Sequence, residues 1–412
     1  MTEESSLIVQ IQTPSGDWMD VGYLHNRKEK NWFEFADPYW EQSSRPVLGQ
    51  IFEEHGRAWQ PNVHSALPRW FSHLLPEGRL REAVATAANI KSSREFELIR
   101  RLGSTDLPGA VRAIESDTRT SDSRIPHTVS DRDHDEDDPL LKFSLAGAQL
   151  KFSVYGDERG LTVPASGQAG NFIMKFPDGR AGFDGVPEAE LASLELARAV
   201  GIRTPQAHLV EPADVAGLEE WAAVTTRRAL AVKRFDRKGK NFRIHMEELA
   251  QILNIPTARD RAKYKGANFE TVAIFIGALA GIDSVGETID RIVLNILIGN
   301  GDAHLKNWAF VYVDGRHPTL SPVYDVLPTV LYIPNDDLGL NLNKSKSFSD
   351  VHIESFTILG SRSGYGGDRA QKRARAAVER VREEWTILKS FLSKKNFTYL
   401  NNRLNELPLA KL

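Results

Sequence analysis

The residues with the clearest capacity for chemistry lie in one polar stretch, Asn300 to Asn307 (NGDAHLKN), which follows the apolar sequence LNILIG. Asp302 and Asn307 have the five-residue spacing of a kinase catalytic loop. In such a loop the aspartate accepts the proton of the attacking hydroxyl, and the asparagine carbonyl oxygen binds magnesium. Aspartate and asparagine also cap and turn ordinary loops, so the spacing alone leaves a structural role open.

A second acidic residue, Asp325, follows two expected strands, Trp308 to Val313 and Thr319 to Val323, which flank a DGRH turn. Because a hairpin brings the chain back to where it began, we expect Asp325 to lie beside Asn307. Magnesium takes oxygen ligands and needs few of them from protein, so one asparagine and one aspartate suffice. The sequence therefore predicts a magnesium site at Asn307 and Asp325.

Small residues between Ser144 and Lys151 (SLAGAQLK) would let backbone N–H groups approach phosphate oxygens. The same residues also suit an ordinary hairpin turn, and no Walker-type G-K-[ST] sequence follows them. Lys175 is isolated within the apolar stretch FIMKF. Its ammonium could pair with phosphates, or it could reach solvent from an edge strand.

A helix after this strand offers a partner for the Lys175 ammonium. Glu190 could hold the lysine in position, with Glu188 and Glu195 as competitors and a solvated helix face as the ordinary alternative. The features then follow the order found in protein kinases: a loop of small residues, a strand lysine, a helix glutamate, Asp-x4-Asn and a metal aspartate. That shared order carries more weight than any single match.

The elements that must position these residues change character along the chain. Residues Glu115 to Pro139 are almost devoid of apolar side chains, which is typical of a mobile linker. We expect a small α+β subdomain over residues 1–114, a flexible acidic linker over 115–139, a strand-rich nucleotide-binding part over 140–243 and a helical lobe over 244–412. Strands before helices predict an α+β, bilobed, protein-kinase-like fold.

Periodicity gives the individual elements. Strands are expected around Leu7 to Ile11 and Trp32 to Phe35, and at Leu141–Tyr155, Phe172–Phe176 and Ala231–Asp236. Helices are expected within Pro68–Asn89, after a Ser92/Glu95 capping box up to Gly103, and at Glu188–Val200, Met246–Leu253, Asn268–Gly281, Val285–Ile298 and Asp368–Leu392.

Composition excludes several classes of protein. The 412 residues are 41% hydrophobic and contain no cysteine, which rules out disulfides, thiolate zinc sites and cysteine nucleophiles. A formal net charge of −3 argues against nucleic-acid binding by bulk positive charge. The polar N-terminus, MTEESS, and the short apolar runs predict a cytoplasmic protein with no membrane partner.

Taken together, these motifs resemble the HipA family of serine/threonine kinases, the toxins of bacterial type II toxin–antitoxin pairs. LPRWFSHLLPEGRLRE and RRLGSTDLPGAV are similar to the family's N-terminal domain. The stretches similar to its kinase core are SLAGAQLKFSV, NFIMKFP, PEAELASLELARAVGI, AVKRFDR, RIHMEELAQ, NGDAHLKNWAF and SPVYDVLP.

The resemblance implies a role for each matching residue. Asp302 is the catalytic base, Asn307 and Asp325 hold magnesium, Lys175 contacts the ATP phosphates, and Ser144 is the autophosphorylated serine that switches the kinase off. The implied nucleotide-binding residues also include Ala146, Gly147, Ala148, Gln149, Leu150 and Lys151, then Lys233, Arg234 and Phe235 on the adenine side, and His304, Leu305, Lys306 and Tyr324. Some relatives carry glutamate at the position of Lys233, which favours a backbone contact there.

The resemblance also implies partners: a HipB-like helix-turn-helix antitoxin, an aminoacyl-tRNA synthetase as substrate, and operator DNA through the antitoxin complex. A basic stretch near the C-terminus could touch DNA phosphates or form a solvated helix face: Arg369, Lys372, Arg373, Arg375, Arg380 and Arg382. Two other functions stay open, a binding module without turnover (a pseudokinase or co-repressor) and a small-molecule kinase.

Overall fold

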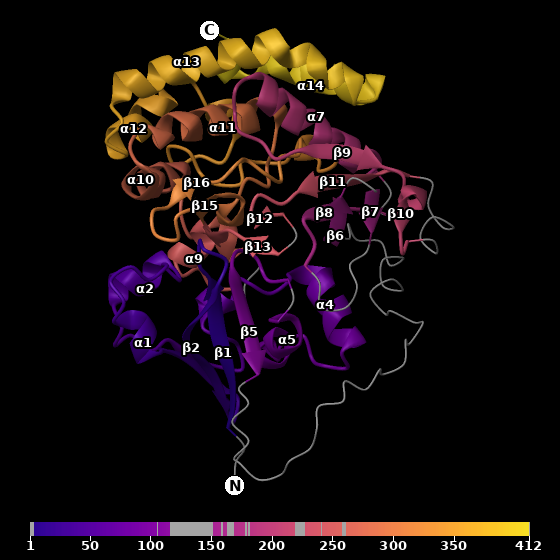
Figure 1. The fold of residues 1–412 in the computed structure, drawn as a ribbon. Helices are drawn as coiled ribbons and strands as arrows, with labels where there is room; N and C mark the ends of the chain where they lie inside the picture. The colour runs from indigo at the N-terminus through magenta and orange to yellow at the C-terminus, as the bar shows by residue number, and fades with distance from the viewer. Residues whose placement is uncertain are drawn as a thin grey trace, which may run out of the picture.

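The chain folds into an α+β structure whose first part is rich in strands and whose last part is helical, as predicted (Figure 1). The computed structural model describes residues 4–104, 106–115, 151–157, 160–162, 169–177, 179, 182–218, 227–239, 241–257 and 261–411. Ser144, the loop residues 146–150 and the linker residues 116–139 lie outside the described residues. Glu115, expected to open the linker, is instead the last residue of strand β5.

The first part is built on a five-stranded antiparallel sheet. Alternate residues of its strand β1, Leu7, Val9 and Ile11, are buried, because side chains along a strand point to opposite faces. In sheet order the strands are β4 (Asn62–His64), β3 (Lys30–Phe35), β2 (Trp18–Arg27), β1 (Ser5–Gln12) and β5 (Val111–Glu115).

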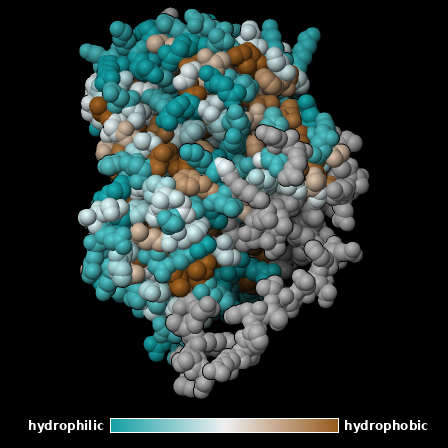
Figure 2. Space-filling view, viewed as in Figure 1, coloured by the Kyte–Doolittle hydropathy of each residue, from teal (hydrophilic) through white to brown (hydrophobic). Residues whose placement is uncertain are grey.

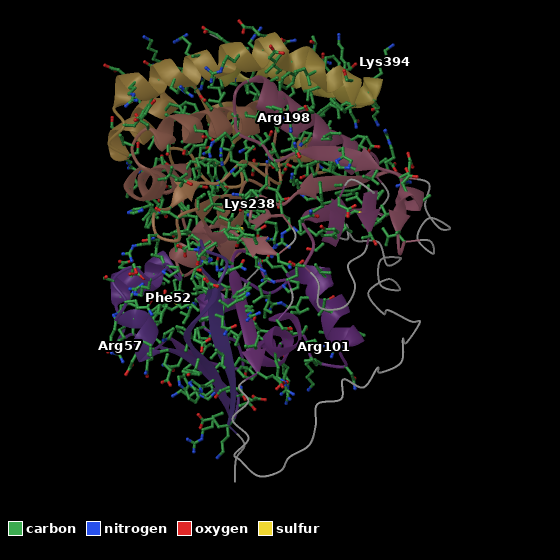
Figure 3. The ribbon with its side chains drawn as sticks, in the orientation of Figure 1. Phe52, Arg57, Arg101, Arg198, Lys238 and Lys394 are labelled. Atoms are coloured by element: carbon green, nitrogen blue, oxygen red, sulfur yellow. The ribbon has the colours of Figure 1, made fainter. Side chains whose placement is uncertain are left out.

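Short helices complete this part. Phe52 of α2, labelled in Figure 3, belongs to the hydrophobic core of this part, and its ring centroid lies 5.6 Å from that of Phe33. They are α1 (Asp37–Trp40), α2 (Gln50–His55), α3 (Arg69–Ser72), α4 (Gly78–Ala87) and α5 (Glu95–Leu102).

The predicted capping box at Ser92 and Glu95 is wrong. Helix α5 begins at Glu95, and its N-cap residue Arg94 makes no side-chain capping bond. The Glu95 carboxylate is buried instead and accepts hydrogen bonds from the Leu67 N–H (2.8 Å) and the Ser72 hydroxyl (2.7 Å). A tertiary contact therefore replaces the local one.

A second sheet of six strands carries the expected lysine strand, and helix α7 (Val186–Ala199) packs against its strands β9 and β11. In sheet order it consists of β10 (Val215–Ala216), β7 (Gly160–Thr162), β6 (Lys151–Asp157), β8 (Phe172–Lys175), β11 (Ala229–Lys233) and β9 (Ala207–Val210).

The helical part surrounds α11, which is buried along almost its whole length. Asn268 caps α10 by accepting a hydrogen bond from the Thr271 N–H at 2.8 Å. The helices are α10 (Phe269–Ala280), α11 (Ser284–Ile298), α12 (Ser355–Arg362), α13 (Gly367–Glu384) and α14 (Lys394–Glu406).

Two helix predictions in this part need correction. Residues 246–253, expected to be helical, contain most of strand β14 (His245–Glu248) and the short helix α9 (Leu249–Ile252). Strand β14 pairs with β15 (Ala309–Tyr312), which pairs with β16 (Thr319–Leu320), so the expected hairpin gains a third strand from outside its own sequence. Helix α13 ends at Glu384, and a 3-10 helix (Trp385–Ser390) follows it.

The surface is mainly polar on the face shown in Figure 2, with apolar residues in separate small patches. Among the described residues, no helix combines the length and the apolar character needed to cross a bilayer. A small hairpin, β12 (Arg237–Lys238) and β13 (Phe242–Arg243), lies where the first part meets the rest (Figure 1).

Candidate active site

The buried ammonium of Lys175 joins three elements that are distant in sequence. Strand β8 places its Nζ atom 2.5 Å from Glu190 Oε1 on α7, and the same ammonium donates a hydrogen bond to Asp325 Oδ1. Of the three candidate glutamates, Glu190 is thus the one that contacts the lysine. Glu188 pairs with Arg228 and Glu195 with Arg198.

Burial and charge oppose each other in this cluster. Burial alone would lower the pKa of Lys175, but the carboxylates of Asp325 and Glu190 outweigh it and raise that pKa. Burial raises the pKa of Glu190, whereas the positive charge of Lys175 overcomes burial at Asp325 and holds its pKa well below the usual range. The ammonium and the Asp325 carboxylate are therefore charged at neutral pH.

Asp325 has a backbone conformation that L-residues seldom adopt, with φ at +54°. Its neighbours fix it: the Tyr324 hydroxyl donates to the Lys306 carbonyl at 2.6 Å, and Val326 is buried in the helical core. Strained residues of this kind persist only where the surroundings over-determine them, and they cluster at functional sites.

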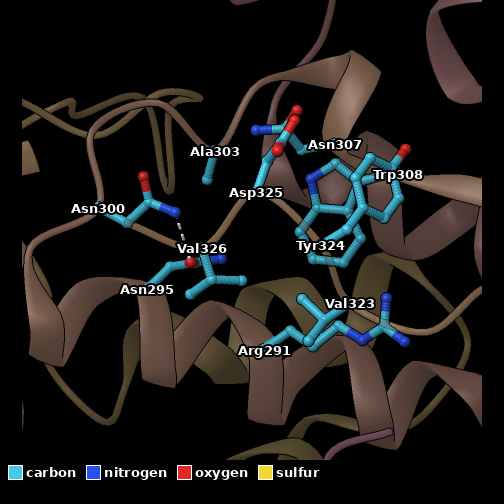
Figure 4. Close-up of a pocket in the computed structure, with 10 residues that line it drawn as sticks. All are labelled: Arg291, Asn295, Asn300, Ala303, Asn307, Trp308, Val323, Tyr324, Asp325 and Val326. Atoms are coloured by element: carbon cyan, nitrogen blue, oxygen red, sulfur yellow. Dashed lines mark hydrogen bonds between the residues drawn. The ribbon is translucent and has the colours of Figure 1, made fainter. Parts of the chain in front are cut away.

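The loop that carries Asp302 starts at a defined helix end. Gly299 terminates α11 with φ at +78°, and a Cβ there would meet Val330 at 2.5 Å, so glycine is required. The Asn300 side chain donates to Asn295 Oδ1 at 2.9 Å (Figure 4) and accepts from the Asp302 N–H at 3.0 Å. The turn is thereby ordered before the aspartate is reached.

Asp302 is about half exposed at its side chain (53%), which leaves it open to an incoming group. The Tyr264 hydroxyl donates to its Oδ1 atom, and His304 Nε2 lies 3.8 Å from the same oxygen. Burial lowers the pKa of His304 to about 4, so this imidazole is neutral at pH 7. Asn307 donates from Nδ2 to the Asp302 carbonyl at 2.7 Å, which closes the loop from Asp302 to Asn307.

The oxygen donors of Asn307 and Asp325 suit magnesium. Both residues line one small cavity, and their polar ends point toward the same edge of it (Figure 4). Because Asn307 uses its amide nitrogen within the loop, its carbonyl oxygen remains the group available to a metal. Magnesium commonly keeps several waters and binds substrate phosphates, so one asparagine and one aspartate are a sufficient contribution from protein.

The residues expected on the adenine side occupy different environments. Lys233 is exposed, with Nζ 3.4 Å from Gln206 Oε1, and the Phe235 ring lies 5.4 Å from that of Tyr324. The Arg234 guanidinium is buried and pairs with Asp106 and Asp236, at 2.7 and 2.8 Å. Its guanidinium is therefore already paired with carboxylates of the protein, and a nucleotide contact by Arg234 stays a prediction.

Two further loop residues, Leu305 and Lys306, belong to a 3-10 turn (Leu305–Asn307), in which Leu305 is fully buried. Lys306 Nζ lies 2.9 Å from Glu77 Oε1 and 3.3 Å from Glu248 Oε2. Beside the site, the more exposed Lys151 places its Nζ atom 3.9 Å from Asp325 Oδ2.

Sequence reasoning missed Glu77, Glu248 and Tyr264. Glu77 and Glu248 fall inside stretches that were recognised as family-like, LPEG and MEELAQ, but nothing in their spacing relates them to Lys306. Two lysines flank Tyr264 in a segment without clear periodicity (KYKG), and a lone tyrosine of this kind gives no sign of a tertiary partner.

Most of the C-terminal basic residues are occupied within the protein. Of the six named above, four bind acceptors in neighbouring segments: Arg369 to Asp283, Arg373 and Arg380 to Asp290, and Arg382 to the Ala410 carbonyl. This favours a structural role for the stretch over contact with DNA.

Comparisons with known proteins find matches for both parts of the chain. Residues 143–385 match the HipA-like C-terminal domain and residues 17–114 the HipA N-terminal domain. A Sinorhizobium fredii protein named "Putative kinase Y4dM" is 36% identical over 368 residues, 87% of each chain. The serine/threonine-protein kinase toxin HipA of Shewanella oneidensis is 21% identical over 323 residues, 71% of this chain and 69% of the relative.

A solved structure shares the fold across nearly the whole length. In a complex of HipA, HipB and operator DNA from Shewanella oneidensis, the matching chain superposes with a TM-score of 0.71 at 14% identity. The match covers 98% of this chain and 96% of that chain.

Proposed function

Since the chain belongs to the HipA family, we propose that it is an ATP-dependent serine/threonine protein kinase and the toxin of a type II toxin–antitoxin pair. Both domains of the family match, and two relatives carry kinase names. The observation that carries the proposal is the Lys175 ammonium held between Glu190 and Asp325, with Asp325 sharing a cavity with Asn307.

In the proposed reaction, each residue of the cluster has one task. Lys175, positioned by Glu190, contacts the ATP phosphates. Asn307 with Asp325 would hold magnesium, which when bound would supply positive charge next to the phosphates. Asp302 accepts the proton of the acceptor serine hydroxyl. The serine oxygen forms a bond to the γ-phosphorus while the bond to the β-phosphate oxygen breaks, and ADP leaves with that electron pair.

The remaining nucleotide contacts rest on the resemblance. We assign the covering loop to residues 146–151, the adenine side to Lys233, Arg234 and Phe235, and the border of the nucleotide to His304 through Asn307 with Tyr324. Autophosphorylation at Ser144 would add negative charge beside a loop that must hold a phosphate, and so would inactivate the kinase.

For partners, we propose a HipB-like helix-turn-helix antitoxin, with operator DNA bound through the complex. The similar Shewanella structure contains HipB and operator DNA, which supports this choice. The proposed substrate is a serine of an aminoacyl-tRNA synthetase in the cytoplasm, whose phosphorylation would stop translation and growth.

The proposal is tested by Asp302→Ala with radiolabelled ATP and, in parallel, by growth after induction. We expect the variant to lose self-labelling and growth arrest together, because general-base removal costs roughly 10²- to 10⁴-fold in rate. Asp368→Asn is the matched control, since Asp368 is an exposed acid in the first turn of α13. Growth arrest that persists without Asp302 would defeat the kinase mechanism.

Ser144→Ala provides a separate test of the proposed switch. It should retain ATP binding and lose the self-label. A phosphorylated residue elsewhere on mass spectrometry would instead relocate the switch.

A further inference from the structure

A segment of the N-terminal subdomain packs against the end of helix α9 and the segment that follows it in the helical part. Residues 69–73 contact residues 251–257 through four polar pairs: Gln251 Nε2 to the Trp70 carbonyl (3.1 Å), Arg69 to the Asn254 carbonyl (2.9 Å), His73 Nε2 to the Ile255 carbonyl (2.9 Å) and Ser72 Oγ to Thr257 Oγ1 (2.7 Å). The two segments are therefore fixed relative to each other just before Glu77.

Glu77 itself reaches the catalytic loop. It is the N-cap residue of α4, and its carboxylate joins two lysines, Lys306 through Oε1 (2.9 Å) and Lys263 through Oε2 (3.1 Å). Burial would raise the pKa of Glu77, but the charges of Lys306 and Lys263 outweigh it and hold that pKa well below its usual range. The Glu77 carboxylate is consequently charged at neutral pH.

The two lysines are connected to opposite ends of the catalytic loop. Lys306 is the residue before Asn307, and its side chain is largely enclosed between Glu77 and Glu248. Lys263 shares a 3-10 turn with Tyr264, which donates a hydrogen bond to Asp302. Glu77 thus connects the turn that holds the aspartate to the residue that precedes the asparagine.

We propose that Glu77 is a positioning residue for the catalytic loop, so that the N-terminal subdomain completes the active site. The inference rests on the proposed kinase function. Glu77 touches neither Asp302 nor Asn307 and acts through Lys306 and Lys263. Small misplacements of reacting groups have large effects on rate, so a residue of this kind controls turnover more than nucleotide binding.

The test compares Glu77→Gln with Glu82→Gln in the full chain. Glu82 is an exposed residue of the same helix, which makes it a control for substitution on α4. For Glu77→Gln we expect kcat of self-phosphorylation to fall roughly tenfold or more, while the KM for ATP changes less than about threefold. Glu82→Gln should match the wild type in both.

Hydrogen–deuterium exchange of the peptide spanning residues 300–308 provides a readout that needs no turnover. Exchange should become faster in Glu77→Gln and stay unchanged in Glu82→Gln, with thermal unfolding of both variants close to the wild type. An active wild type whose Glu77→Gln variant keeps normal kcat and normal exchange overturns the inference. An inactive wild type with faster loop exchange in Glu77→Gln overturns the kinase proposal and leaves the positioning role standing.

Discussion

Two buried charge clusters in this molecule contain the same kinds of groups in different proportions. Between the N-terminal subdomain and the second sheet, Arg234 and Arg237 face Asp106 and Asp236, two cations to two anions. At the candidate site, one buried ammonium, Lys175, serves two carboxylates.

The different ratio of cations to carboxyl groups indicates that the two clusters have different roles. In the cluster at the subdomain boundary, each arginine contacts both aspartates, and Asp236 also accepts a hydrogen bond from the Gly109 N–H at 2.8 Å. The site cluster has one carboxylate more than it has buried cations, and the nearby Lys151 is more than half exposed. A balanced cluster fixes two parts of the chain together, whereas a cluster with more carboxyl groups than buried cations has oxygen ligands to offer a metal cation.

Removing one cation from each cluster should give the largest effects and separate the two roles. Arg234→Met leaves Arg237 as the one arginine for two largely buried carboxylates and should lower the free energy of unfolding by roughly 3–5 kcal/mol. Lys175→Met should destabilise similarly and also abolish phosphoryl transfer in the protein that remains folded. Urea denaturation with single-turnover phosphorylation measures both, and transfer by a folded Lys175→Met variant would contradict the assignment.

A third buried carboxyl, that of Glu247, extends the comparison because its partners are neutral hydrogen-bond donors. Glu247 accepts hydrogen bonds from the Gln50 N–H (2.9 Å), Trp70 Nε1 (3.1 Å) and the Tyr312 hydroxyl. Burial raises its pKa to about 7 despite these bonds. Since the folded-state pKa is raised, its contribution to stability is complete at low pH and is lost as pH rises through about 7.

Glu247→Gln removes this titration. The free energy of unfolding of the wild type relative to the variant should fall by about 3 kcal/mol between pH 4.5 and 8, as measured by urea midpoints across that range. A difference that stays flat with pH would show that Glu247 is already ionised in the folded protein.

The smallest effect is expected at a partly exposed pair. Arg373 binds Asp290 on α11 through Nε at 2.8 Å and Nη2 at 2.5 Å, but Arg380 also pairs with Asp290 at 3.1 Å. Arg373→Ala should therefore lower the free energy of unfolding by only about 1 kcal/mol or less. A loss as large as that of Arg234→Met would erase the distinction between buried and exposed pairs.

Much of the architecture was predictable because local sequence dictates it. The alternation around Leu7 to Ile11 and the helices expected over residues 268–281 and 285–298 each correspond to an observed element. The predictions that were wrong, at Glu95 and at residues 246–248, are places where side chains or strands are used by distant segments. A local sequence pattern carries no information about these contacts with distant segments.

The sequence by itself determined the family, the order of the chemical groups and the residues Lys175, Asp302, Asn307 and Asp325 as candidates, because motif spacing is a property of the chain. Only the tertiary structure decided that Glu190 is the partner of Lys175, that Asp325 takes a left-handed backbone conformation, and that Glu77 reaches Lys306 across 229 positions. Electrostatic pairing acts over a few ångströms of space whatever the separation along the chain. Which charges meet is therefore fixed by packing.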